Sequence, residues 1–142
     1  MACESEKKQF TKLSHKDTGI DFVNKLYETN TRNYFTYPYM YLGGGVATGD
    51  FNNDGLEDLF FTGNMVPNKL YLNEGDFKFK DISETAGIQG DDRWYSGVSV
   101  IDINNDGFLD LYIAVGGENK PNNNVLYINK DRKSTRLNSS HQ

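Results

Sequence analysis

The stretch GDFNNDGLEDLFF, residues 49–61, places many acidic side chains directly before an apolar run. Within it, oxygen-bearing side chains occupy the first, third, fifth and ninth positions of a loop: Asp50, Asn52, Asp54 and Asp58. Gly55 at the sixth position allows a sharp turn, because glycine adopts backbone conformations that other residues avoid. Carboxylates this close together repel one another. An ordinary turn does not need so many of them, so the loop has another function.

The same loop recurs in IDINNDGFLDLYI, residues 101–113. Both copies follow a strand-like stretch that begins with Gly-Val, and both lead to a related motif, NKLYLN at residues 68–73 and NVLYIN at residues 124–129. A third element appears as FTKLSHKDTGI at residues 10–20 and as FKDISETAGI at residues 79–88. Self-similarity of this kind indicates a repeat architecture, in which each copy is one supersecondary unit.

The repeated pieces are typical of β-strands. VATGD, VSVID, DLFFT and DLYIAV are short and apolar, and they are too short for helices. FKFKD, residues 77–81, alternates apolar and charged residues, which predicts a half-buried strand with Lys78 and Lys80 facing water. Four short antiparallel strands per unit make the blade of a β-propeller. The sequence therefore predicts an all-β fold over residues 10–130, with about two four-stranded antiparallel blades of an incomplete propeller.

The oxygen-only donor set of the two loops predicts calcium. Ca²⁺ takes six to eight oxygen ligands at about 2.3–2.6 Å, whereas zinc and copper favour His and Cys ligands. In loop 50–58 the expected ligands are the side chains of Asp50, Asn52, Asp54 and Asp58 and the backbone carbonyl of Leu56. In loop 102–110 they are the side chains of Asp102, Asn104, Asp106 and Asp110 and the carbonyl of Phe108. Two structural Ca²⁺ sites are expected.

Acidic loops of this kind have two other interpretations. An EF-hand requires a Glu at position twelve and flanking helices, but Phe61 and Ile113 stand there and the flanks read as strands. Turns rich in Asp and Asn also form without any metal, because these side chains bond to nearby backbone groups. Position eight holds Glu57 in one copy and Leu109 in the other, so it is not expected to be a ligand.

The two ends are interpreted as lying outside the fold. Residues 1–9 resemble the end of a bacterial lipoprotein signal, with Ala2 before a Cys3 that would receive lipid and a polar tether after it. The alternative is an ordinary initiator Met followed by an exposed free cysteine. Residues 131–142 resemble the in-frame translation of a sequencing-adapter oligonucleotide. We interpret them as a disordered artefact and the chain as a fragment.

At these motifs the chain resembles the FG-GAP/VCBS repeats of integrin-like β-propellers. The F-x-x-[IL]-S and N-x-L-Y-x-N elements look like those of the bacterial relatives of cartilage acidic protein, which carry ASPIC/UnbV segments; no such segment is present in this sequence. The resemblance implies a propeller of about seven blades, within the usual range for that architecture. It also implies calcium at the two acidic loops, where the metal braces strands within a blade.

Composition narrows the possible functions. The net charge is −5 and no basic stripe appears, which argues against a nucleic-acid surface. No run approaches the roughly 20 apolar residues of a membrane helix, so a membrane contact is expected only through Cys3. His15 is the only histidine outside residues 131–142, and the sequence shows no Ser/His/Asp or Cys/His constellation for nucleophilic catalysis.

The sequence therefore predicts a non-catalytic calcium-binding repeat segment of a bacterial protein that is extracellular or at the outer-membrane surface. Its expected role is binding, adhesion or scaffolding, with an unidentified protein or glycan ligand and the remaining blades of the full-length chain as partners. The alternative is a fragment of a carbohydrate-active enzyme or of its accessory glycan-binding module. The Tyr-rich residues 27–41 have no assigned role.

Overall fold

The structure is a computed structural model that describes residues 9–117 and 122–130 and the backbone of residues 137–140. It consists of two four-stranded antiparallel sheets, each with its strands in chain order. The first blade contains β1 (Val46–Gly49), β2 (Asp58–Phe61), β3 (Lys69–Asn73) and β4 (Phe79–Asp81). The second blade contains β5 (Trp94–Ile101), β6 (Asp110–Gly116), β7 (Val125–Asn129) and β8 (Leu137–Ser140). The predicted all-β class and the four-stranded antiparallel blades are confirmed.

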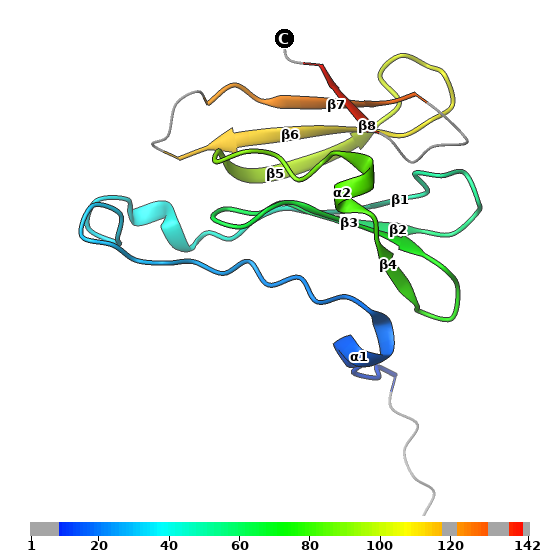
Figure 1. The fold of residues 1–142 in the computed structure, drawn as a ribbon, viewed down its shortest axis with the longest axis horizontal. Helices are drawn as coiled ribbons and strands as arrows, with labels where there is room; N and C mark the ends of the chain where they lie inside the picture. The colour runs from blue at the N-terminus through cyan, green and yellow to red at the C-terminus, as the bar shows by residue number, and fades with distance from the viewer. Residues whose placement is uncertain (1–8, 118–121, 131–136, 141–142) are drawn as a thin grey trace, which may run out of the picture.

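The two blades lie face to face, and the hydrophobic core is the layer between them (Figure 1). The first blade contributes Phe51, Phe60, Leu70, Ile82, Ala86 and Ile88, and the second contributes Tyr95, Leu111, Ile113, Val125 and Tyr127. Because side chains alternate between the two faces of a strand, every second residue of β2, β3, β6 and β7 enters this layer. The burial pattern of these strands is therefore that of sheet-on-sheet packing.

Close approach of the inner strands depends on glycine. A Cβ atom placed on Gly45, just before β1, would lie 2.9 Å from the backbone nitrogen of Val98 and 3.0 Å from Cα of Gly97. Real Cβ atoms essentially never show the first of these distances and rarely show the second, so a side chain at residue 45 would push β1 away from β5. Gly45 thus has a packing role between the blades.

Two one-turn helices were not predicted. α1 (His15–Thr18) begins just after the Ser of the first F-x-x-[IL]-S element, and α2 (Ser83–Ala86) begins at the Ser of the second. Each ends at a glycine in the left-handed conformation, Gly19 with φ 80° and Gly87 with φ 69°, which is the usual way to terminate a helix. The shared Gly-Ile that follows the Ser in both copies was the signal for these turns.

The predicted strand at residues 77–81 begins later than expected. Asp76 and Phe77 have positive φ angles of 49° and 56°, so they form the turn between β3 and β4 rather than the start of a strand. Phe77 is exposed, and β4 covers only Phe79–Asp81. Lys78 and Lys80 are exposed, as predicted.

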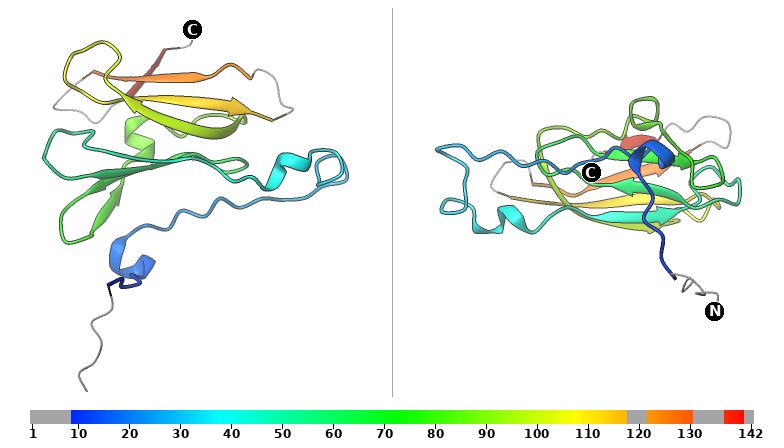
Figure 2. Two further views of the ribbon diagram at one scale, coloured as in Figure 1. Left: turned by 180° about the vertical axis from the view of Figure 1, so that it is seen from behind. Right: turned by 90° about the horizontal axis from the view of Figure 1, so that it is seen from below.

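The chain before β1 makes an extended run and a projecting loop (Figure 2). Residues 20–27, which we call the strap, run along the side of the first blade that faces away from the second blade (Figures 1 and 2). The projecting loop follows at residues 28–42 and includes the 3₁₀ helix η1 (Pro38–Tyr41). The helices that the structure describes are single turns, and none has the length and apolar character to cross a membrane.

The interpretations of the two ends concern mostly residues outside the described ranges. The tether at residues 1–9 and the lipidation candidate Cys3 lie there except for Gln9, as do residues 131–136 and 141–142. The backbone of residues 137–140 pairs with β7, with Leu126 opposite Ser140 and Asn129 opposite Leu137. The assignment of residues 131–142 to an adapter sequence and the domain boundaries remain predictions.

Candidate metal loops

The first acidic loop is held by hydrogen bonds from its own backbone to its carboxylates. Oδ1 of Asp50 accepts from the backbone N–H of Asp54 at 3.0 Å, and Oδ2 accepts from that of Gly55 at 2.8 Å. Oδ1 of Asp54 accepts from the N–H of Leu56 at 2.8 Å, and Oδ2 accepts from Nδ2 of Asn52 at 2.8 Å. Positions one, three and five therefore share one compact network.

The second loop repeats these bonds atom for atom. Oδ1 and Oδ2 of Asp102 accept from the backbone N–H groups of Asp106 and Gly107 at 3.1 and 2.9 Å. Oδ1 and Oδ2 of Asp106 accept from the N–H of Phe108 and from Nδ2 of Asn104, both at 2.9 Å. The agreement shows that the shared D-x-N-N-D-G sequence fixes one local conformation in both blades.

The carboxylate at position nine has a different role, because it ties the loop to the sheet. Asp58 is fully buried, and it accepts from the N–H of Phe51 at 3.0 Å and from that of Asn73 at 2.8 Å. The equivalent Asp110 is also fully buried and accepts from Ile103 at 3.1 Å and Asn129 at 2.7 Å. One buried carboxylate thus joins the start of the loop, the second strand and the end of the third strand.

Burial, together with the nearby carboxylates of Asp54 and Asp50, raises the pKa of Asp58 to about 6, although the two backbone donors act in the opposite direction. The salt bridges that the structure describes do not include Asp58. A buried anion without a cationic partner is costly, so a metal ion beside this group would relieve the cost.

Two residues that hold the loops were not predicted from the sequence. Nδ2 of Asn73 donates to the carbonyl of Glu57 at 3.0 Å. Nδ2 of Asn129 donates to the carbonyl of Phe51 at 2.7 Å, which lies in the loop of the other blade. Both are the last Asn of the N-x-L-Y-x-N element, so the repeat itself carried the signal.

The two loops lie on the same side of the molecule and touch (Figure 1). Nδ2 of Asn53 donates to the carbonyl of Gly107 at 3.2 Å. Asn53 and its equivalent Asn105 both have φ 57°, a left-handed conformation that Asn tolerates better than most residues. Position four of each loop is therefore suited to reach the next loop along the repeat.

The donor set fits a hard cation in its chemistry. An ionised carboxylate has about four acceptor sites, and the hydrogen bonds described above use two on each of Asp50, Asp54 and Asp58. The described residues include no group of three or more His, Cys, Asp or Glu side chains already gathered as a metal site. The structure places positions one, three and five together and anchors position nine in the sheet; the carbonyls of Leu56 and Phe108 remain predicted ligands.

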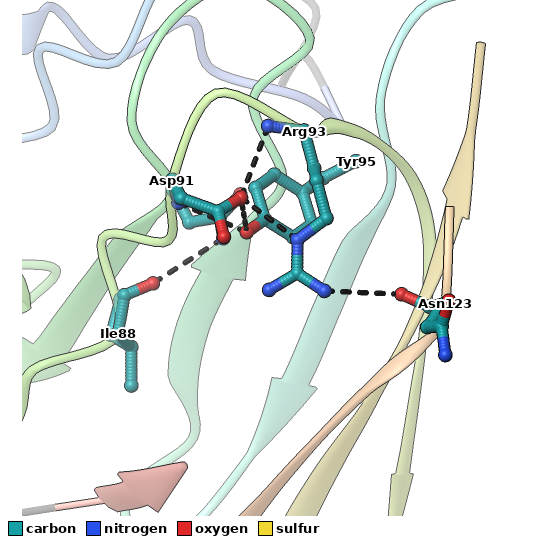
Figure 3. Close-up of polar contacts among 6 residues, drawn as sticks. Ile88, Asp91, Arg93, Tyr95 and Asn123 are labelled. Carbon is teal, nitrogen blue, oxygen red and sulfur yellow. Dashed lines mark hydrogen bonds and ion pairs between the residues drawn. The ribbon is translucent and has the colours of Figure 1, made fainter. Parts of the chain in front are cut away.

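A polar cluster lies at the opposite end of the blades, where β5 begins (Figure 3). Asp91 accepts from Nε of Arg93 and from the hydroxyl of Tyr95, both at 2.8 Å, and NH1 of Arg93 donates to the carbonyl of Asn123 at 3.2 Å. The side chain of Arg93 beside it lowers the pKa of Asp91 to about 2. This carboxylate is held ionised and bonded, which suits a structural role better than that of a proton donor.

Two blade-like sheets joined by matched acidic loops define a β-propeller-type repeat protein. A family model described as an FG-GAP-like repeat matches residues 50–113, which run from the first acidic loop into β6. This match and the similarity described next support an FG-GAP repeat protein.

The chain is also similar to cartilage acidic protein 1 from three animals. It is 35% identical over 94 residues to the Xenopus tropicalis protein and 33% identical over 94 residues to the Homo sapiens protein, in both cases over 66% of this chain. It is 31% identical over 91 residues to the Mus musculus protein, over 64% of this chain. The matched region spans 14% of each relative. Neither the family description nor these names refer to an enzymatic activity.

Proposed function

We propose that this chain is a calcium-braced, non-catalytic segment of a longer extracellular β-propeller, which serves binding or scaffolding. The observation that carries the calcium assignment is the matched pair of loops, in which the same oxygen-rich residues adopt the same hydrogen bonds. A loop selected only for turning would not need a fully buried carboxylate at its ninth position in both copies.

Calcium at each loop would act by joining groups that the fold already brings near. Asp50, Asn52 and Asp54 belong to the turn, whereas Asp58 belongs to β2 and contacts β3 through Asn73. A cation held between them would neutralise their mutual repulsion and link the turn to two strands. The same argument applies to loop 102–110, and the metal has no chemical step to perform.

The extracellular location is supported by the relatives, whose printed name refers to cartilage. Extracellular calcium modules commonly have dissociation constants of about 10⁻⁴–10⁻³ M, and Asn in place of Asp at position three lowers the negative charge of the site. The chain covers only a small part of its relatives, so the ligand of the whole protein is assigned only by class: another protein or a glycan. A lipid anchor at Cys3 and a bacterial source remain part of the proposal.

Thermal unfolding with millimolar calcium and with chelator tests the metal assignment. At ten to one hundred times the dissociation constant, two sites would raise the unfolding midpoint by roughly 5–10 °C. The double variant Asp54→Ala/Asp106→Ala should lose this rise. Glu57→Gln is the matched control, because it removes a carboxylate from the same loop at a position that is not a predicted ligand. A midpoint that calcium leaves unchanged would falsify the calcium proposal.

A further inference from the structure

A pocket of about 420 Å³ lies beside the polar cluster of Asp91 and Arg93, at the end of the blades opposite the acidic loops. Three segments line it: residues 64–67 between β2 and β3, residues 89–93 between α2 and β5, and Arg32 of the projecting loop. Its volume lies within the range of roughly 300–1,000 Å³ that is usual for small-molecule sites. The pocket is formed at strand ends where two packed blades meet, away from the outer faces on which further blades would pack.

Hydrogen bonds between the lining segments hold the pocket in shape. The buried Asn64 donates from Nδ2 to the carbonyl of Tyr95 at 2.8 Å, and its Oδ1 accepts from Nδ2 of Asn24 at 2.6 Å. The backbone N–H of Asn68, which is fully buried, donates to the carbonyl of Gln89 at 3.0 Å. The loop between β2 and β3 is therefore tied both to the strap and to the connection between the blades. A pocket that is already formed lowers the entropic cost of binding.

The charged groups of the lining balance one another. The guanidinium of Arg93 is buried, whereas the side chain of Asp91 is 55% exposed and lies between Arg93 and Tyr95 (Figure 3). With Arg32 and Asp92 the lining carries two guanidinium groups and two carboxylates, so its formal charge is zero. An ionised ligand would meet a like charge as well as an opposite one, and like charges in contact are costly. The pocket therefore favours a neutral ligand.

The polar and apolar parts of the lining indicate what kind of neutral ligand fits. Ionised carboxylates only accept hydrogen bonds, guanidinium groups only donate them, and the amide of Gln89 does both. Hydroxyl groups both donate and accept, so a ligand rich in hydroxyls can bond to all three kinds of group. Met65 and Val66 are half-buried in the same pocket and supply an apolar surface. A sugar ring combines hydroxyls around its edge with C–H groups on its faces, and it matches both parts.

We propose that this pocket binds a neutral sugar residue of a glycan. The C–H face of the ring packs on Met65 and Val66, and its hydroxyls bond to the side chains of Asp91, Asp92 and Gln89. This inference rests on the binding role in the proposed function and narrows the ligand from a protein or a glycan to a glycan. It does not involve the calcium loops, which lie at the other end of the blades.

The test is an array of neutral and sulfated oligosaccharides probed with the fluorescently labelled full chain. We expect binding to at least one neutral oligosaccharide, and competition by the same oligosaccharide in solution. The variant Gln89→Ala/Asp92→Ala should weaken this binding roughly tenfold or more, because hydrogen bonds to charged groups are among the stronger ones. Val66→Asp should abolish it by placing a charge on the apolar surface.

The matched control is Glu84→Ala. Glu84 is an exposed acidic residue of α2, in the same connection between the blades, and it is not among the described residues that line the pocket. The variant should therefore bind the oligosaccharide as tightly as wild type. Thermal unfolding of each variant shows whether it is folded. If the double variant does not fold, Gln89→Ala alone should still weaken the binding, and unchanged binding by that folded variant contradicts the proposal.

Three further outcomes would overturn the proposal: no binding to any neutral oligosaccharide, binding confined to sulfated ones, or equal binding by wild type and the folded double variant. The calcium assignment has its own readout in the unfolding midpoint. A midpoint that rises with calcium, together with an array that shows no binding, overturns the sugar site alone. Sugar binding with a midpoint that calcium does not change overturns only the calcium assignment.

Discussion

Asn129 of the second blade donates its side-chain amide to the backbone carbonyl of Phe51 in the loop of the first blade, at 2.7 Å. Its backbone N–H donates to Asp110 of its own blade at 2.7 Å. A single buried residue at the end of β7 thus joins the two acidic loops. The equivalent Asn73 bonds within its own blade, to Glu57, Asp58 and Gly75.

This difference predicts unequal effects of the same substitution. Asn129→Ala should lower the free energy of unfolding by roughly 1–3 kcal/mol, because it leaves a buried carbonyl without its donor. Asn73→Ala should cost less, because Asn73 is partly exposed and its amide bond lies at the surface. Urea unfolding of both variants measures the two costs. Equal losses would show that the contact between blades adds nothing to stability.

The raised pKa of Asp58 predicts how the free energy of unfolding of the calcium-free protein depends on pH. Its folded pKa of about 6 lies above the ordinary value near 3.9, so between about pH 4 and 6 the folded state holds more protons than the unfolded state. The free energy of unfolding therefore rises as pH falls through this window and decreases as pH rises through it. For this group the change is on the order of 1–3 kcal/mol.

The measurement compares wild type with Asp58→Asn in chelator, at pH 7 and at pH 4.5. Relative to Asp58→Asn, the free energy of unfolding of wild type should be higher at pH 4.5 than at pH 7. With saturating calcium the trend should reverse, because protons then compete with the metal for the carboxylate. A difference that is independent of pH in chelator contradicts the prediction.

The lowered pKa of Asp91 predicts the opposite dependence at lower pH: the free energy of unfolding should fall as pH falls. Its folded pKa of about 2 lies below the ordinary value, so its stabilising contribution is complete above about pH 4 and is lost as pH falls toward 2. The contribution is expected to be below about 1 kcal/mol, because a partly exposed ion pair is screened by solvent. Unfolding of Asp91→Asn and wild type should converge near pH 2. If the two proteins still differ in stability near pH 2 as much as at neutral pH, the charge of Asp91 does not stabilise the fold.

Gly45 and Gly97 occupy equivalent positions in the two units, but we expect them to differ in how well they tolerate substitution by alanine. Gly45→Ala should be destabilising by roughly 1–3 kcal/mol, because its methyl group would collide with the backbone of Gly97 and Val98. Gly97→Ala should be tolerated, since a Cβ atom there would meet only the Cβ of Ala114 at 3.7 Å. Thermal unfolding of the two variants gives the comparison, and equal midpoints would refute the packing argument.

The repeat made much of this fold predictable. The loops at residues 50–58 and 102–110 and the apolar runs after them define the hairpins of both blades, because a sharp acidic turn followed by strand residues leaves few alternatives. Phe77 was misplaced because its sequence alternates correctly, while its backbone is set by the turn through Gly75 and Asp76, where φ is positive. Alternation alone does not show where a turn ends.

The contacts between blades could not be predicted from spacing. Asn53 and Asn129 are ordinary loop and strand-end residues in the sequence, and their bonds to Gly107 and Phe51 arise only when the two sheets pack. The strap was also missed, because its residues 21–27 lie outside the repeated elements that the sequence shows. The calcium ligands remain a prediction from residue type and spacing, to which the structure adds a shared conformation and a buried carboxylate.

Asn53 and Asn129 each donate a hydrogen bond to the acidic loop of the other blade, and both bonds end on main-chain oxygens, that of Gly107 and that of Phe51. Every residue type supplies such an oxygen, so these contacts do not constrain which side chain stands at either receiving position. Units joined in this way are interchangeable: one could be duplicated, deleted or exchanged for a divergent copy without redesign of its neighbour's loop. The junction therefore favours growth of the array by gene duplication, with side chains left free to diversify.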